Sequence, residues 1–344
     1  MTSWFGTGRR DAPGSLSPLH QPNRRPDLKA VSLPDLSAEL LARLTSGETY
    51  GAYVLLGEQL KQSLAGVVDV HENRFAPARY RDQLQPILGR LGTGALTGAT
   101  VVDLGCGSLN PFALSFLLLM LGVERAYAID IEPIQDFRVA SQAMAAAAGA
   151  MLLDPSKIVG AGRISPEAVL KNLNGFQLPL LAAGDPAGIA GDRLQHRVES
   201  IYDLSLGDGE VDAVFTVSVF EHLERVDEAL DSLRRITRPG GVGCHVVDFS
   251  DHRRYAESYG ISNPLEFLTV DSFAPAERMH WSNRLRCGEI CAMFERHGFA
   301  VEDAQSAWTE PVSTQERAEF VEPYRSMSLQ DLEIIVARIF VRRV

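Results

Sequence analysis

An apolar run that ends in an acid and two glycines is the stretch of this sequence best suited to hold a ligand. Val101 and Val102 precede Asp103, and Gly105 and Gly107 follow it, before a segment compatible with a helix. Glycines let the backbone approach a ligand because no Cβ stands in the way, and a helix start offers free N–H groups. The Asp103 carboxylate would repel a phosphate at close range and attract a cation. The turn therefore favours a ligand that brings positive charge, although a βα turn without a ligand has the same pattern.

Ionisable side chains follow three further predicted strands. An acid that ends the second strand of such a fold can accept both hydroxyls of a ribose, or it can cap the next helix. Groups after the fourth and fifth strands could orient and deprotonate an acceptor. They could also bind a divalent metal, but a metal needs more ligands in a fixed geometry, so we expect no metal ion. These residues are Asp130 after the second strand, His222 after the fourth, and Asp248, Asp251 and His252 after the fifth.

A short segment further along the chain combines an aromatic platform, an amide and two guanidinium groups. This mixture suits a polar or anionic acceptor such as a sugar, a carboxylate or a phosphate. The residues are Trp281, Asn283, Arg284 and Arg286.

Strands and helices must alternate to bring these residues together. Apolar runs predict strands and helical periodicity predicts helices, and the alternation predicts a doubly wound, mostly parallel sheet. Arg238-Pro239-Gly240-Gly241 is expected to stop the helix before the fifth strand. Strands are predicted at 99–104, 126–130, 198–202, 212–217, 242–249, from 299 and at 332–341, and helices at 79–91, 111–121, 133–148, 226–236 and 286–297.

The chain divides into segments of different composition. Residues 1–35 predict a flexible arm. Residues 36–95 predict helices that either cap the ligand mouth or pack on the sheet, and 96–344 predict the α/β domain. Within it, 150–195 predicts an inserted lobe and 250–284 a connection on the substrate side.

The bulk composition excludes several classes of protein. The 344 residues carry a net charge of −11, which disfavours nucleic-acid binding through phosphates. The four cysteines lack metal-knuckle spacing and predict buried side chains in a reducing compartment. The apolar run over 111–123 is too short to span a bilayer, and no signal-peptide pattern appears, so we expect a cytoplasmic protein. A homodimer is left open.

Five quoted motifs together resemble the class I S-adenosylmethionine-dependent methyltransferases. Asp103 to Gly107 is similar to their first motif and Asp130 to their second. Asp203-Leu204 resembles the third, where an acid meets the adenine, and 212–223 resembles the fourth, followed at similar spacing by 238–241. The resemblance implies a seven-stranded Rossmann-like fold and S-adenosylmethionine as cofactor. It implies cofactor contacts from Asp103, Gly105, Cys106, Gly107, Asp130, Ile131, Asp203, Leu204 and Ser218.

This resemblance implies methyl transfer to a small-molecule or glycan-like acceptor, by O- or N-methylation, as in specialised-metabolite and surface-glycan pathways. His222 stands where some O-methyltransferases keep a general base, although a histidine there can also brace the loop. His222, His252 and Asp248 are the catalytic candidates. A nicotinamide-dependent oxidoreductase is the first alternative, but Asn110 replaces the third glycine of its fingerprint. A protein that binds S-adenosylmethionine without catalysis is the second.

Overall fold

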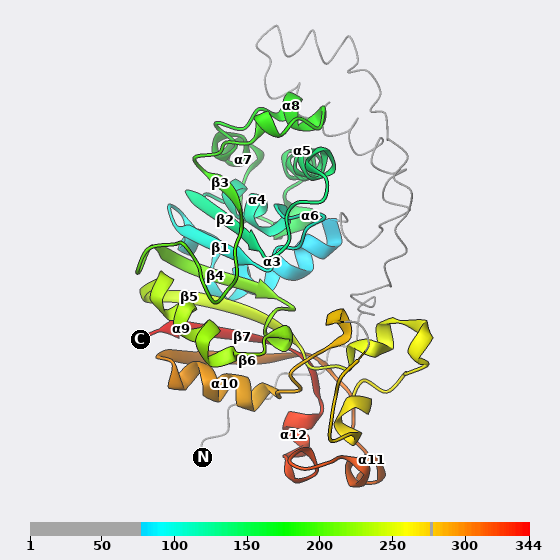
Figure 1. Ribbon diagram of the computed structural model, residues 1–344. Coiled ribbons are helices and arrows are strands. Elements are labelled where there is room, and N and C mark those ends of the chain that lie inside the picture. Colours follow the sequence, from blue (N-terminus) through cyan, green and yellow to red (C-terminus); the bar gives the residue numbers. More distant parts are fainter. Residues whose placement is uncertain (1–76, 276–277) are drawn as a thin grey trace, which may run out of the picture. The chain divides into compact units, whose positions relative to one another are not determined.

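Figure 1 shows the protein as a computed structural model that describes residues 77–275 and 278–344. The predicted arm and most of the predicted helical segment lie outside these residues. By their internal contacts, the described residues form two units. The first unit comprises 77–200 with 211–213, and the second comprises 201–210 with 214–344.

The strands of the first unit are parallel. β1 (Thr100–Leu104) pairs with β2 (Arg125–Asp130), which pairs with β3 (Leu194–Val198). β1 and β2 are buried for most of their length, which explains their continuous apolar sequences. The helical elements are α3 (Pro77–Leu91), η1 (Thr93–Leu96), α4 (Ala113–Met120), α5 (Phe137–Leu153), α6 (Ser156–Val159), α7 (Pro166–Asn172), α8 (Leu178–Ala182) and η2 (Pro186–Gly188).

The most apolar helix of the chain is buried on nearly all sides. Leu114 to Met120 of α4 are all buried, and α4 packs on β1 and β2. This explains a run of apolar residues without amphipathic period. Among the described residues, none of the helices has both the length and the apolar content to cross a membrane.

The predicted insertion is a set of short helices. α7 and α8 pack against α5, and α6 packs against α3. Arg193 links the segment after α7 to the turn before β2. Its guanidinium donates to the carbonyls of Asn172 at 2.6 Å, Asn174 at 3.0 Å and Val123 at 3.2 Å. The described part of α3 buries Leu84, Ile87 and Leu88, which fits core packing for this last part of the predicted helical segment.

The second unit contains the antiparallel end of the sheet. β4 (Val211–Val217) begins in the first unit, and β5 (Thr237–Asp248), β6 (Phe299–Thr309) and β7 (Ile334–Arg343) follow. β7 is antiparallel to both β5 and β6. α9 (Val226–Ile236) packs on β5, and α10 (Cys287–Arg296) packs on β6 and β7. The strand order is β3-β2-β1-β4-β5-β7-β6, and the predicted seven-stranded, mostly parallel doubly wound sheet is confirmed.

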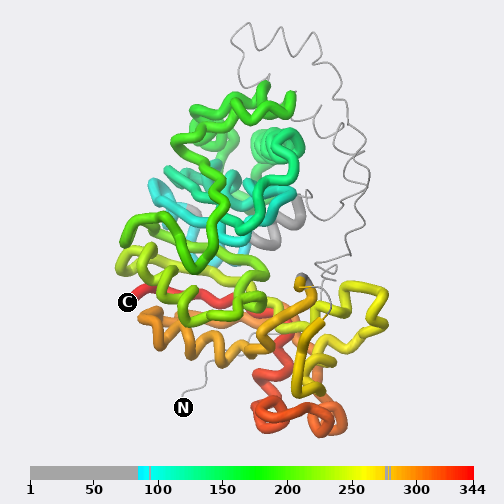
Figure 2. The backbone as a smooth tube through the Cα atoms, in the orientation of Figure 1, coloured from blue at the N-terminus to red at the C-terminus, as the bar shows by residue number. Residues whose placement is uncertain are grey.

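A small apolar cluster joins two connections of the second unit. One holds η4 (His252–Tyr255), η5 (Glu257–Tyr259), η6 (Glu266–Thr269) and η7 (Arg278–His280); the other holds α11 (Thr314–Glu319), η8 (Tyr324–Ser326) and α12 (Leu329–Leu332). Figure 2 shows the yellow and the orange-red tube of these connections side by side. Phe267 and Leu268 from the first pack with Phe320 and Leu332 from the second.

Three predicted strand boundaries were wrong. β3 lies four residues earlier than predicted, β5 starts at Thr237 and includes the Arg-Pro-Gly-Gly sequence, and the last strand begins at Ile334 after the short helix α12. β3 is an edge strand whose central residues are half-buried, so its sequence lacks a strong apolar pattern. Thr237 follows α9 directly, so the helix ends without a separate turn.

Candidate active site

The turn after β1 contains two residues in backbone conformations that favour glycine. Gly105 has a φ of 76° and Gly107 a φ of 78°. The N–H groups of Gly105 and Cys106 donate to the Ile129 carbonyl at 2.7 and 3.3 Å, which ties the turn to β2. A Cβ built at Gly107 would meet no atom within 4 Å. The turn therefore leaves room for a ligand beside its backbone.

Burial raises the pKa of two ionisable groups of this turn, Asp103 and Cys106. Asp103 is 6% exposed, and Ser115 Oγ donates to its Oδ2 at 3.5 Å. Burial raises the pKa of Asp103 to about 7 against the Ser115 hydrogen bond, and the charge of Asp130 adds to the rise. Burial also raises the pKa of the Cys106 thiol, so this cysteine is no thiolate nucleophile. A ligand cation beside Asp103 would favour its ionised form.

Asp130 is held in place by the turn and by its own loop. Its Oδ2 accepts the Gly107 N–H at 2.8 Å, and its Oδ1 accepts the Glu132 N–H at 3.0 Å. Each carboxylate oxygen has two lone pairs, so each can accept a second hydrogen bond from a ligand hydroxyl. The N-cap of α5 is Asp136, whose carboxylate accepts from the N–H groups of Arg138 and Val139. The capping role considered for Asp130 therefore belongs to another residue.

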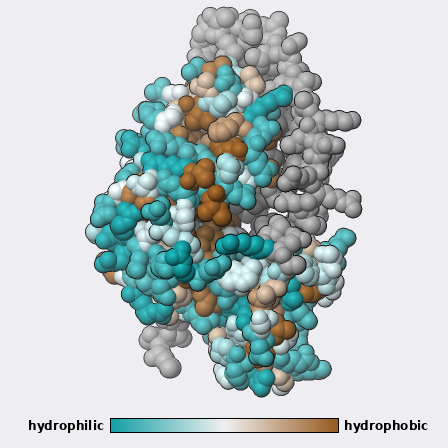
Figure 3. Space-filling model, viewed as in Figure 1, coloured by the Kyte–Doolittle hydropathy of each residue, from teal (hydrophilic) through white to brown (hydrophobic). Residues whose placement is uncertain are grey.

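Three apolar side chains of the first unit are exposed, and two of them, Ile131 and Val198, are neighbours of Asp130. Ile131 is 72% exposed, Val198 54% and Phe137 48%, and Val198 is the register partner of Asp130. Figure 3 shows a face on which hydrophilic residues predominate. Sequence reasoning selected Ile131 but missed Val198. Exposure distinguishes them from core residues, and a single sequence does not display exposure.

The other predicted cofactor contacts belong to the second unit. Asp203 is exposed, and Leu204 is 3% exposed. Ser218, directly after β4, has a φ of 54° and donates its N–H to the Val246 carbonyl at 2.9 Å. A positive φ is uncommon for a residue with a side chain and marks constrained backbone. The side chain of Leu204 faces the interior, so a ligand contact there falls to its backbone.

A cluster of four ionisable residues lies at the carboxyl ends of β4 and β5. We call Glu221, His222, Asp248 and His252 the histidine cluster. Glu221, Asp248 and His252 are each no more than 4% exposed, and His222 is half-buried. The two imidazole rings lie 4.8 Å apart between centroids. Asp248 Oδ2 lies 3.6 Å from His252 Nε2, and the Asp248 N–H donates to Glu221 Oε1 at 3.2 Å.

The charges of the histidine cluster depend on one another. Burial raises the pKa of Glu221 to about 8, although the charge of His252 opposes the rise. Burial also disfavours an ionised Asp248, but His252 and Ser250 outweigh it and lower the pKa of Asp248 to about 2. For His252, burial is outweighed by the neighbouring carboxylates, Asp248 above all, so its pKa is raised. Asp248 is therefore the ionised member of the cluster, and its charge favours the protonated form of His252.

A backbone segment before α10 holds Glu221 and His222. Nδ1 of His222 donates to the Trp281 carbonyl at 2.8 Å. The Asn283 amide donates to the carbonyls of Phe220 at 2.7 Å and Leu223 at 3.0 Å, and the Asn283 N–H donates to the Glu221 carbonyl at 2.8 Å. The turn η3 (Phe220–His222) is therefore fixed from both sides.

Comparison with known proteins identifies the domain. Residues 180–244 match the family model of the methyltransferase domain, and the strand order, with β7 antiparallel, is that of the class I fold. This match supports the predicted class I S-adenosylmethionine-dependent methyltransferase domain. The nicotinamide-dependent alternative is thereby set aside. A search of curated protein sequences finds no match.

Solved methyltransferase structures resemble this domain at low identity. An S-adenosylmethionine dependent methyltransferase from Mesorhizobium loti is 15% identical, with 78% of this chain and 98% of that chain covered and a TM-score of 0.39. A Burkholderia thailandensis 1,6-didemethyltoxoflavin-N1-methyltransferase is 13% identical, with 91% and 93% covered and a TM-score of 0.40. A geranyl diphosphate C-methyltransferase from Streptomyces coelicolor is 16% identical, with 76% and 77% covered and a TM-score of 0.41.

Like Asn283, three other predicted acceptor-binding residues have structural partners. Arg286 is fully buried and donates to the carbonyls of Phe249 at 2.6 Å, Leu332 at 2.9 Å and Ile334 at 2.5 Å. The Arg284 guanidinium donates to carbonyls of the 267–271 loop. Asp251 is fully buried and forms a bidentate pair with Arg253. The sequence pattern showed the charges but not these partners, and we infer that the three side chains stabilise the fold.

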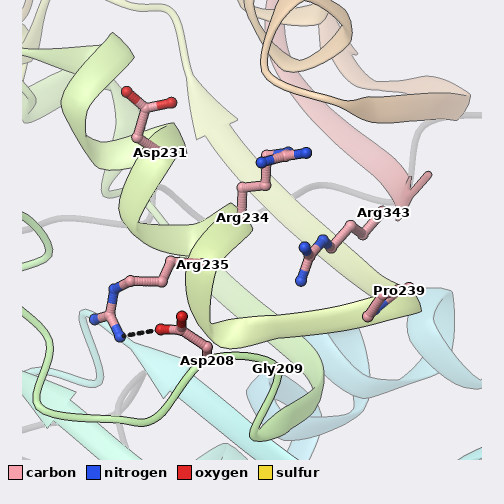
Figure 4. A pocket seen from close by; sticks show the side chains of 7 residues that line it. All are labelled: Asp208, Gly209, Asp231, Arg234, Arg235, Pro239 and Arg343. Carbon is pink, nitrogen blue, oxygen red and sulfur yellow. Dashed lines mark hydrogen bonds and ion pairs between the residues drawn. The ribbon is translucent and has the colours of Figure 1, made fainter.

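A surface pocket lies at the end of β5 that is opposite the histidine cluster. Figure 4 shows the residues that line this pocket. It lies at the amino end of β5 and the carboxyl ends of α9 and β7. Arg235 donates to Asp208 at 3.2 Å and to the Leu206 carbonyl at 2.6 Å. Ligands of such sheets bind at the carboxyl ends of the parallel strands, so this pocket is not the cofactor site. Its lining residues are Asp208, Gly209, Asp231, Arg234, Arg235, Pro239 and Arg343.

Proposed function

We propose that this methyltransferase transfers the methyl group of S-adenosylmethionine to a hydroxyl or amine of a small-molecule acceptor. In this proposal Asp103, Asp130 and the glycine turn bind the donor, and the histidine cluster takes up the proton that the acceptor loses. Surface-glycan or specialised-metabolite acceptors remain the predicted class.

The groups of the first unit have the chemistry that the donor needs. S-adenosylmethionine carries an ammonium, a sulfonium and a ribose. The buried Asp103 offers a carboxylate for a cation, Asp130 can accept ribose hydroxyls, and the exposed Ile131 and Val198 offer apolar surface for the adenine. These features support donor binding by the first unit.

The histidine cluster is the observation that carries the acceptor half of the proposal. Four ionisable groups, three of them almost fully buried, stand at strand ends where ligands of α/β sheets bind. Perturbed ionisation in such a place is typical of functional sites. A histidine there can accept a proton near neutral pH. The net charge of −11 supports a small acceptor in place of a nucleic acid.

Transfer of a labelled methyl group tests the proposal. The full-length protein is incubated with methyl-labelled S-adenosylmethionine and a panel of hydroxyl- and amine-bearing small molecules. His222→Ala and His252→Ala should lower turnover of the best acceptor by about 10²–10⁴ if that residue handles the proton. Donor affinity, measured by titration calorimetry, should stay near that of the wild type in both.

His297→Ala is the matched control, because His297 lies at the end of α10 and pairs with Asp227 and Asp231. Its turnover should equal that of the wild type. Full turnover in both cluster variants would refute the role of the cluster and would leave alignment alone as the source of the acceleration.

A further inference from the structure

Glu221, His222 and His252 bring three potential metal ligands into one small volume. One ligand atom from each residue lies within 4.8 Å of the other two, the only such group of three among the described residues. Tetrahedral ligands at about 2.1 Å from an ion are about 3.4 Å apart. The three atoms lie near this spacing, and ion binding would draw them closer together.

Buried polar atoms of these residues lack protein partners. Glu221 Oε2 and both ring nitrogens of His252 are buried without a hydrogen bond, and each of these two side chains is about 2% exposed. Buried polar atoms almost always have partners, and their absence is costly. A bound cation would supply the missing partner for Glu221 and for one nitrogen of His252.

The surroundings orient the ligands as the outer shell of a metal site does. His222 Nδ1 donates to the Trp281 carbonyl at 2.8 Å, which fixes the tautomer with the lone pair on Nε2. Glu221 Oε1 accepts the Asp248 N–H at 3.2 Å, so Oε2 is the oxygen directed to an ion. Asp248, held by the Tyr255 hydroxyl at 2.9 Å, lies 3.6 Å from His252 Nε2. Such partners are typical for ligating histidines and carboxylates.

The ligand set indicates the kind of ion. Mg²⁺ and Ca²⁺ prefer oxygen ligands only, whereas two imidazoles with one carboxylate suit first-row divalent ions such as Zn²⁺, Co²⁺ or Fe²⁺. We propose that Glu221, His222 and His252 bind one first-row divalent metal ion. This proposal departs from our expectation from the sequence that no metal is bound, which did not consider Glu221 as a ligand.

The metal site and the proposed function make different predictions for the two histidines. A single general base predicts loss of turnover in one histidine variant only. A metal site predicts loss in both, together with loss of the ion. The metal proposal concerns binding by the free protein, and it does not rest on the identity of the acceptor.

Metal titration of the full-length protein tests the site. The protein is dialysed against a chelator and then titrated with Zn²⁺ by calorimetry and with Co²⁺ by visible absorption. We expect one equivalent of tight binding, with Co²⁺ bands typical of low coordination number, and no binding of Mg²⁺ at the same concentrations. Wild-type protein that binds neither Zn²⁺ nor Co²⁺ would overturn the proposal.

Three variants assign the ligands. His222→Gln, His252→Gln and Glu221→Gln should each weaken Zn²⁺ binding at least about tenfold, the lower end of the effect of even outer-shell changes. Circular dichroism identifies a variant that fails to fold. In that case, Zn²⁺ binding by the other two variants tests the ligand assignment. His297→Gln removes a surface histidine flanked by two carboxylates and should leave Zn²⁺ binding unchanged. Unchanged affinity in folded cluster variants, or loss in His297→Gln, would place the ion elsewhere.

Methyl transfer by the same samples separates the two proposals. Tight Zn²⁺ binding without turnover of any acceptor supports the metal site and removes the proposed acceptor role. Turnover in chelator-treated protein that binds no ion supports the acceptor role and removes the metal site.

Discussion

Nδ1 of His222 donates a hydrogen bond to the carbonyl oxygen of Trp281 at 2.8 Å, across 59 positions of the sequence. Two residues further on, Asn283 bonds the carbonyls on either side of the same turn. The connection that follows β5 therefore positions the end of β4. It fixes which nitrogen of His222 bears the proton and which carries the lone pair.

Removal of the Asn283 side chain should loosen this turn. Asn283→Ala leaves two backbone carbonyls without their donor, and we expect the free energy of unfolding to fall by about 1–3 kcal/mol. Turnover should fall more than donor affinity, because the turn carries His222 and not the glycine loop. Chemical denaturation and titration calorimetry measure the two effects. The exposed Asn174 gives the control Asn174→Ala, and equal stability loss in both variants would contradict the role of Asn283.

Gly107 offers a test of the donor site that keeps the fold. Gly107→Asn places a side chain in the open space beside the turn, and asparagine tolerates positive φ better than other residues with a side chain. We expect S-adenosylmethionine binding to weaken at least about tenfold, or 1.4 kcal/mol, by calorimetry. Gly98→Asn is the control, because Gly98 has a φ of 74° and equally open surroundings. If both variants bind the donor as the wild type does, the ligand does not lie at Gly107.

Asp130→Ala should weaken S-adenosylmethionine binding by about 1–3 kcal/mol, the cost of leaving ribose hydroxyls and the loop N–H groups without their acceptor. Binding is measured by calorimetry, with NAD as a second ligand that should not bind. Asp192→Ala, at an exposed position before β3, is the control. Unchanged affinity in Asp130→Ala would remove this carboxylate from the donor site.

The raised pKa of Asp103, about 7, predicts a pH dependence of donor binding. Below that pH the carboxyl is neutral, and above it the carboxylate attracts the cationic donor. Donor affinity should therefore rise between pH 6 and pH 8. Asp103→Asn should bind more weakly and should lack this rise. A rise of the same size in Asp103→Asn would assign the titration to another group or to the donor itself.

His297 predicts a pH dependence of stability. Burial opposes its charge, but hydrogen bonds to Asp227 and Asp231 outweigh burial and raise its pKa. Because the folded state binds the proton more tightly, this contribution is present below the ordinary histidine pKa of about 6.5. It is lost as the pH rises through the higher folded value. The difference in melting temperature between wild type and His297→Gln should therefore be larger at pH 6 than at pH 8.5. A difference independent of pH would contradict the linkage.

The sequence by itself determined the local features of the glycine turn and of the elements around it. Patterns within a few residues predicted the acid and glycines of the turn, Asp130 and the helix over 226–236. A buried strand requires apolar residues, and a positive φ in a turn favours glycine, so both can be recognised from residue type. The same holds for the order of strands and helices. The predicted position of the edge strand β3 was wrong, because a half-buried strand has a weaker apolar pattern in its sequence.

Only the tertiary structure decided which residues form the histidine cluster. Sequence reasoning found His222, Asp248 and His252, yet it passed over Glu221, the immediate neighbour of His222. Glu221 became a candidate because β5 and the 281–283 segment bury it beside His252. Arg286 was predicted to bind the acceptor. In the structure, it is surrounded by the carbonyls of Phe249, Leu332 and Ile334 and stabilises the fold. Burial and hydrogen-bond partners come from residues distant in the sequence, so residue type and spacing could not reveal them.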